Sequence, residues 1–102
     1  MEKIKITSDP DKTITWIWLD PETGGQLKME YYDFSGLAYY LFGNNIVYTL
    51  KVEETERLFF LTKRDEDSLL RWLMDNFTNF FGIKRWLEDN KVAYCVEIGK
   101  LT

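Results

Sequence analysis

Residues 12–33 read KTITWIWL, DPETGG and QLKMEYYD in succession, and this stretch decides the fold. In the first and last segments, apolar or aromatic side chains recur at every second position, which is the period of a β-strand. The middle segment is a turn sequence, because proline restricts its own φ angle and glycine tolerates a positive one. The stretch therefore predicts antiparallel strands over residues 12–19 and 26–33, joined by a short turn.

Three other stretches have the same two-residue period. Residues 3–7 alternate charged residues with isoleucine, and residues 46–52 and 92–98 alternate large apolar side chains with smaller or polar ones. Side chains at alternate positions of a strand share one face, so one set from each strand is expected to face a common core. The predicted inward-facing set is Leu27, Met29, Tyr31, Ile46, Tyr48, Leu50, Val52, Val92, Tyr94, Val96 and Ile98.

Between residues 53 and 90 the apolar period changes to that of helices. A first helix is predicted over residues 53–62, with an alternative strand over residues 58–61. A second helix follows the acidic turn at residues 65–67, and a third starts near Thr78 and ends at Asn90.

A further short helix is predicted over residues 35–43, where a serine precedes the helical stretch and a glycine ends it. Helices grouped together beside mainly antiparallel strands are typical of the α+β class. We expect one domain over residues 1–102, in which a single mainly antiparallel sheet of four to five strands carries two to three helices on one face.

The chain contains no histidine, although it has four tryptophans, six tyrosines and seven phenylalanines. Histidine is the usual general base near neutral pH and the commonest metal ligand. The acidic clusters at residues 9–11 and 65–67 are interpreted as turns and helix caps, because neither has the further ligands of a calcium loop. We therefore expect no enzymatic activity, no catalytic residue, no cofactor and no metal.

Charge and cysteine content restrict the partner and the compartment. The formal net charge is −4, with 13 basic and 17 acidic residues, which disfavours binding to nucleic acid. Cys95 is the single cysteine, so the chain cannot form an internal disulfide and suits a reducing cytoplasm. The sequence has no secretion-signal pattern and no apolar run long enough for a membrane span, so a cytoplasmic location without membrane contact is expected.

The strand over residues 12–19 has large apolar side chains on both faces. Two indole rings bury the largest area, so Trp16 and Trp18 are expected to face the helices. The opposite face then joins side chains of the strand over residues 26–33 in an apolar centre with a polar rim, as in transient protein interfaces. The alternative is that these are ordinary surface residues. The predicted partner-binding residues are Ile17, Leu19, Tyr32, Lys28, Glu30 and Thr15.

The second half of the chain contains YTLKVEET at residues 48–55 and WLEDNKVAY at residues 86–94, with two helical patterns between them. Over about residues 46–96 it resembles small bacterial proteins of the toxin-immunity type. The resemblance implies a similar fold and an immunity role, but it transfers no binding residue. The ending EIGK at residues 97–100 differs from the aromatic cluster that often closes such proteins.

These observations favour a protein-binding inhibitor without catalytic activity, namely an immunity protein that neutralises a bacterial toxin by occlusion. One alternative is a phage-encoded anti-defence inhibitor of the anti-CRISPR kind, and another is a structural or self-assembling module. The expected partner is a protein, without direct nucleic-acid contact, and the chain is expected to be a monomer or a homodimer.

Overall fold

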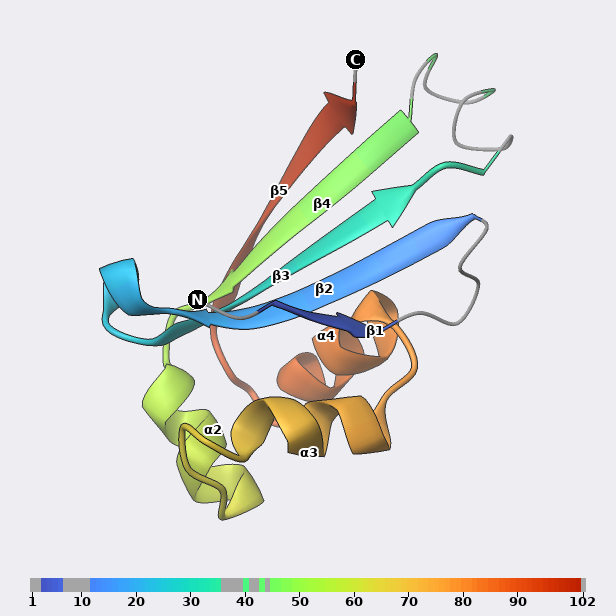
Figure 1. Cartoon of the computed structure of the whole chain (residues 1–102). Helices are drawn as coiled ribbons and strands as arrows, with labels where there is room; N and C mark the ends of the chain where they lie inside the picture. Colours follow the sequence, from blue (N-terminus) through green and yellow to red (C-terminus); the bar gives the residue numbers. More distant parts are fainter. Residues whose placement is uncertain (1–2, 7–11, 36–39, 41–42, 44, 102) are drawn as a thin grey trace.

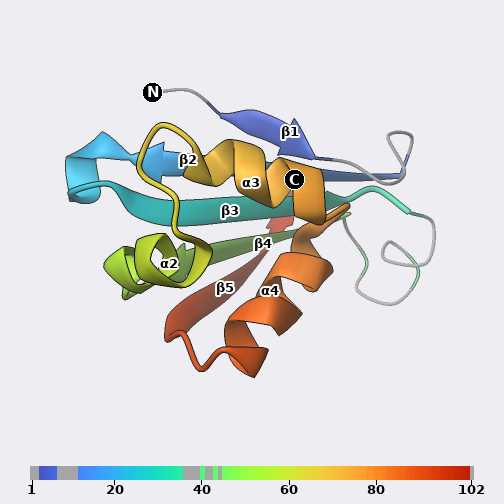
Figure 2. The same ribbon diagram turned by 90° about the horizontal axis from the view of Figure 1, so that it is seen from below.

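The structure is a computed structural model that describes residues 3–6, 12–35, 40, 43 and 45–101. Its strands form one antiparallel sheet in which neighbours in the sequence are neighbours in space. The helices cover one face of this sheet (Figures 1 and 2). The α+β class is therefore confirmed. The elements are β1 (Ile4–Ile6), β2 (Thr13–Asp20), β3 (Gln26–Asp33), β4 (Asn45–Val52), α2 (Thr55–Thr62), α3 (Leu69–Asn76), α4 (Phe80–Asp89) and β5 (Tyr94–Leu101).

The predicted hairpin is present, and Asp20 organises its turn. The Asp20 carboxylate accepts a hydrogen bond from the backbone N–H of Glu22 at 2.9 Å. A short 3-10 helix follows at Pro21–Thr23 and ends at Gly24, which has a φ angle of 73°. The turn holds β2 and β3 in register from Asp20 opposite Gln26 to Thr13 opposite Asp33.

The core lies between the sheet and the three helices. One row of side chains crosses all five strands, and its three middle members are fully buried. The predicted inward orientation of β3 and β4 is confirmed by this row. Ile98 is an exception to the predicted core, because 66% of it is exposed where the sheet extends past the helices. The row consists of Ile4, Ile17, Met29, Leu50 and Val96.

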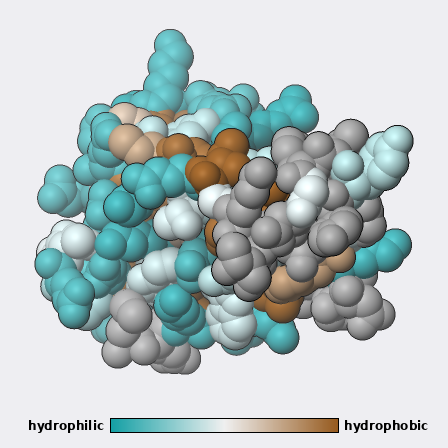
Figure 3. Space-filling model, turned by 90° about the horizontal axis from the view of Figure 1, so that it is seen from above, coloured by the Kyte–Doolittle hydropathy of each residue, from teal (hydrophilic) through white to brown (hydrophobic). Residues whose placement is uncertain are grey.

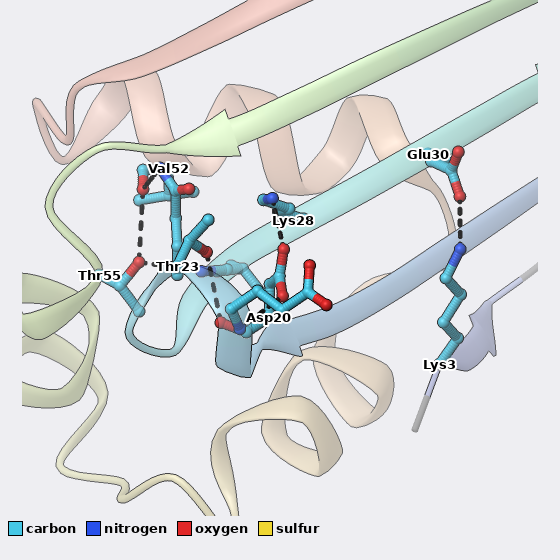
Figure 4. Close-up of polar contacts among 10 residues, drawn as sticks. Lys3, Asp20, Thr23, Lys28, Glu30, Val52 and Thr55 are labelled. Atoms are coloured by element: carbon cyan, nitrogen blue, oxygen red, sulfur yellow. Dashed lines mark hydrogen bonds and ion pairs between the residues drawn. The ribbon is translucent and has the colours of Figure 1, made fainter. Parts of the chain in front are cut away.

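The segment after β4 is a helix, so the alternative strand over residues 58–61 is wrong. Thr55 holds the first turn of this helix against the sheet. Its hydroxyl oxygen accepts the backbone N–H of Leu27 at 3.0 Å and donates to the carbonyl of Val52 at 3.4 Å (Figure 4). The Thr55 hydroxyl thus gives the backbone N–H of Leu27 an acceptor at the point where β4 ends and no longer supplies one.

The third predicted helix is also present, but its cap is one residue later than Thr78. The side chain of Asn79 accepts the backbone N–H of Gly82 at 3.0 Å. A second hydrogen bond comes from the sheet, because the Thr15 hydroxyl oxygen accepts the N–H of Phe80 at 3.1 Å. Two of the four free N–H groups at the start of α4 are therefore satisfied by side chains.

Two predictions lie largely outside the described residues: the short helix over residues 35–43 and the acidic turn over residues 9–11. None of the described helices is long and apolar enough to cross a membrane.

Candidate functional site

The structure reverses the predicted orientation of β2. Thr15 and Ile17 are only 1% and 0% exposed, and Leu19 packs against the same core. These three predicted partner-binding residues therefore face the helices and cannot form a docking surface. The residues that face away from the helices are Ile14, Trp16 and Trp18, by the alternation of the strand.

Lys5 of β1 and Lys3, which directly precedes β1, lie over the tryptophan rings of the uncovered face. The ammonium of Lys3 lies 4.2 Å from the centre of the Trp18 ring, and that of Lys5 lies 5.8 Å from the Trp16 ring. Such cation–π contacts keep the charged end in water while the aliphatic stem shields the ring. Trp18 is only 7% exposed although none of the described helices covers it. The large area of the tryptophan rings therefore did not predict correctly which face of β2 points toward the helices.

We call the sheet surface opposite to the helices the outer face. Its central row runs from Trp16 to Glu30, Thr49 and Glu97. Figure 3 views the molecule from this side and shows a mostly hydrophilic surface with a small hydrophobic area in its described part. The outer face consists of Lys3, Lys5, Ile14, Trp16, Trp18, Lys28, Glu30, Tyr32, Val47, Thr49, Lys51, Cys95 and Glu97.

Glu30 is the polar centre of the tryptophan-bearing half of this face. Its carboxylate pairs with the Lys3 ammonium at 3.0 Å (Figure 4). It also accepts the Tyr32 hydroxyl at 3.1 Å. Burial of the ring, followed by the nearby Glu30 charge, raises the pKa of Tyr32 above its ordinary value. The Tyr32 hydroxyl is therefore a stable hydrogen-bond donor at neutral pH.

A second ion pair lies toward the hairpin end of the outer face. The Lys28 ammonium is 2.5 Å from the Asp20 carboxylate, and both side chains are largely shielded from solvent. The hydrogen bond from Lys28, followed by that from the Glu22 N–H, lowers the pKa of Asp20. Both ion pairs place fixed charges of both signs around the aromatic rings. Protein interfaces commonly have a polar rim.

At the β5 side of the outer face, the Cys95 thiol lies 2.8 Å from a carboxylate oxygen of Glu53. This hydrogen bond is the largest cause that raises the pKa of Cys95. A nucleophilic cysteine needs a lowered pKa, which a neighbouring cation or an activating base provides. The surroundings of Cys95 therefore favour the neutral thiol and oppose nucleophilic chemistry.

Two adjoining clefts of about 310 and 440 Å³ lie beside the β2–β3 turn. They share Glu66, and their linings also include Glu53 and Glu56. Within the described ranges, no group of three or more acidic or cysteine side chains is arranged to hold a metal ion. In the predicted acidic turn, the Asp65 carboxylate accepts the N–H groups of Asp67 and Ser68, which is the structural role expected for it.

Of the six predicted partner-binding residues, the structure brings Lys28, Glu30 and Tyr32 together on the outer face. Sequence reasoning missed the two tryptophans that lie beside them. The alternation of lysine with isoleucine in residues 3–7 carried a usable signal, because a short edge strand with such a pattern can lay lysine stems over neighbouring rings. Comparisons with protein-family models, with curated proteins and with solved structures give no match.

Proposed function

We propose that this chain is a protein-binding inhibitor without catalytic activity, and that it contacts its partner through the outer face. The observation that carries the proposal is the presence of the partly exposed Trp16 and Tyr32, beside the buried Trp18, on a sheet face that no described helix covers. Tryptophan and tyrosine dominate the binding energy of protein interfaces, because each buries a large area at a low cost in side-chain entropy. A rigid sheet holds these rings in place before the partner binds, which lowers the entropic cost further.

The charges on the outer face favour a protein over a nucleic acid. A surface for single-stranded nucleic acid combines stacking rings with a continuous cationic path. Here Lys3 and Lys28 are paired with carboxylates, and Glu30 and Glu97 lie in the same row as Trp16. Phosphates passing over this row would meet Lys5, the Lys3–Glu30 ion pair and the carboxylate of Glu97, which do not form a continuous cationic path. A protein surface can match such alternating charges with its own.

We propose a bacterial toxin as the partner, in line with the resemblance of residues 46–96 to toxin-immunity proteins. Inhibition by occlusion needs a stable scaffold and a complementary patch of about 800 Å² per partner, and it needs no catalytic group. The neutral Cys95 thiol and the single-cysteine composition suit action in the cytoplasm. An anti-defence inhibitor would use the same surface physics against a different enzyme.

A co-expression experiment tests this function. The protein encoded beside this gene is produced alone, with the native chain, and with the variant Trp16→Ala/Tyr32→Ala. We expect the native chain to rescue growth and to co-purify with the toxin in an equimolar complex, and the variant to lose both effects while remaining folded by circular dichroism. The matched control is Phe60→Ala, which removes an exposed ring from α2 and should protect fully. Rescue by the outer-face variant as strong as that by the native chain would contradict the proposal.

A further inference from the structure

The two borders of the sheet differ in length and in chemistry. β1 pairs with β2 over only three residues, its central residue is the exposed Lys5, and the exposed Lys3 directly precedes it. β5 pairs with β4 over eight residues on one side, and no described strand pairs with its other side (Figure 1). Short, charged edges resist strand addition, whereas long edges without proline invite it. β5 is therefore the edge of this sheet that is open to another strand.

The hydrogen-bond pattern identifies which backbone groups of β5 are available. The N–H of Glu53 donates to the carbonyl of Ala93 at 2.9 Å, one step beyond the pair Val52 and Tyr94. Opposed residues in an antiparallel pair alternate between bonded and non-bonded pairs. Odd-numbered residues of β5 thus bond to β4, and the N–H and C=O groups of Tyr94, Val96 and Ile98 point to the open edge.

The same three residues have their side chains on the helix side of the sheet. Ile98 is 66% exposed there, and it lies opposite Tyr48, whose ring is 6.0 Å from that of the exposed Phe81. An open row of backbone groups is therefore bordered by an apolar patch. A strand that added to β5 would gain hydrogen bonds and would also cover this patch.

We propose that β5 pairs antiparallel with β5 of a second copy of this chain, so that two sheets join into one. The proposed register sets Val96 opposite Val96 of the second copy. Tyr94 then lies opposite Ile98 of the second copy, and Cys95 lies opposite Glu97. This register is self-complementary, because its helix-side pairs are all apolar and it opposes no like charges. Sliding one strand by two residues in one direction would set Glu97 opposite Glu97, which is unfavourable.

The size of the contact predicts the strength of the dimer. A single pair of short strands buries less than the roughly 800 Å² per partner of a standard stable interface. We therefore expect a dimer that dissociates on dilution. The outer faces of the two copies would then form one continuous surface, which presents the tryptophan set twice.

Analytical ultracentrifugation of the full chain tests the association. The weight-average mass should rise from 12.2 kDa toward twice that value. The concentration range needed runs from about 1 μM to about 500 μM, as suits a weak interface. Ile98→Pro removes an N–H that points to the open edge and should weaken dimerisation at least tenfold, as should Ile98→Lys. The control Phe60→Lys changes an exposed apolar residue on α2 and should dimerise like the native chain. A monomer throughout the range, or a dimer that both Ile98 variants leave unchanged, would overturn the proposal.

Disulfide trapping tests the register independently of affinity. In the proposed dimer, positions 95 and 97 of the two copies form a non-bonded pair with Cα atoms about 4.5 Å apart, within the range of a disulfide. Glu97→Cys in the native background should therefore form a covalent dimer under mild oxidation. Glu97→Cys in a Cys95→Ser background should not, because position 97 does not face itself. Trapping of the second variant alone, or of neither variant, would contradict the register.

Discussion

At the scale of single residues, two hydroxyl groups add hydrogen bonds to the apolar contacts that attach α2 and α4 to the sheet. Thr15 lies in a strand and Thr55 in a helix. Both are small polar residues whose burial the hydrophobic pattern does not predict. Each accepts a buried backbone N–H from another element, Phe80 for Thr15 and Leu27 for Thr55. Leaving such a donor without a partner is costly, so both threonines belong to the core although they are polar.

Thr15→Val should destabilise the protein by about 1–3 kcal/mol, because it keeps the shape of the side chain but leaves the Phe80 N–H buried without an acceptor. Urea denaturation followed by circular dichroism measures the change. The matched control is Thr49→Val, a similar substitution on the outer face, where the expected change is within about 0.5 kcal/mol. Equal effects of the two substitutions would show that the hydroxyl of Thr15 is not needed.

Cys95 should react slowly with alkylating reagents, because its hydrogen bond to Glu53 raises the pKa of the thiol and lowers the thiolate fraction at a given pH. Glu53→Gln removes the charge that opposes ionisation, so the pH profile of the iodoacetamide reaction should move to lower pH. Glu54→Gln makes the same change of charge at the next residue and should leave the profile in place. A profile that is identical in all three proteins would rule out the role of Glu53.

At the scale of elements, the sequence predicted all five strands and the three described helices to within a few residues. The turn chemistry at residues 20–25 and the change of period at residue 53 are local signals, and local structure follows them. The orientation of β2 could not be predicted, because both faces of this strand carry large apolar groups. Its orientation depends on Lys3, Lys5 and Phe80, which are distant in sequence or in another layer.

Substitutions of the two isoleucines in β2 test this orientation directly. Ile17→Ala should cost about 2–5 kcal/mol of unfolding free energy, because Ile17 is fully buried under the helices. Ile14→Ala changes the same residue type on the opposite face of the same strand and should cost about 1 kcal/mol or less. Chemical denaturation compares the two variants. A larger loss of unfolding free energy for Ile14→Ala than for Ile17→Ala would instead support the orientation predicted from the sequence.

The β2–β3 turn should make stability depend on acid pH. The pKa of Asp20 in the folded protein is lowered below its ordinary 3.8, first by the hydrogen bond from Lys28. A lowered folded pKa gives stability that is complete above the ordinary value and is lost as pH falls through the folded value. As the pH falls below 3.8, native stability should therefore fall more steeply than that of Asp20→Asn. Lys28→Met should flatten the dependence in the same direction, and equal slopes in all three proteins would contradict this role.

At the scale of the whole molecule, the described helices all lie on one face of the sheet, and none of them covers the other face (Figure 1). On a one-sided sheet of this kind, the open face is normally polar. Here it carries Trp16, Trp18 and Tyr32 within a frame of ion pairs. The sequence indicated half of this site through Lys28, Glu30 and Tyr32. It could not supply the other half, because the register that joins Trp16 to Glu30 is a property of the assembled sheet.

The most direct test of the central proposal is calorimetric titration of the proposed toxin partner with matched variants of the chain. The outer-face variant Trp16→Ala/Tyr32→Ala should bind at least tenfold more weakly than the native chain, a loss of about 1.4 kcal/mol or more. The helix-side control Phe60→Ala/Phe81→Ala removes two exposed rings from α2 and α4 and should bind like the native chain. If the outer-face variant is folded and binds with native affinity while the helix-side variant loses affinity, the partner binds the helices and the proposal is wrong.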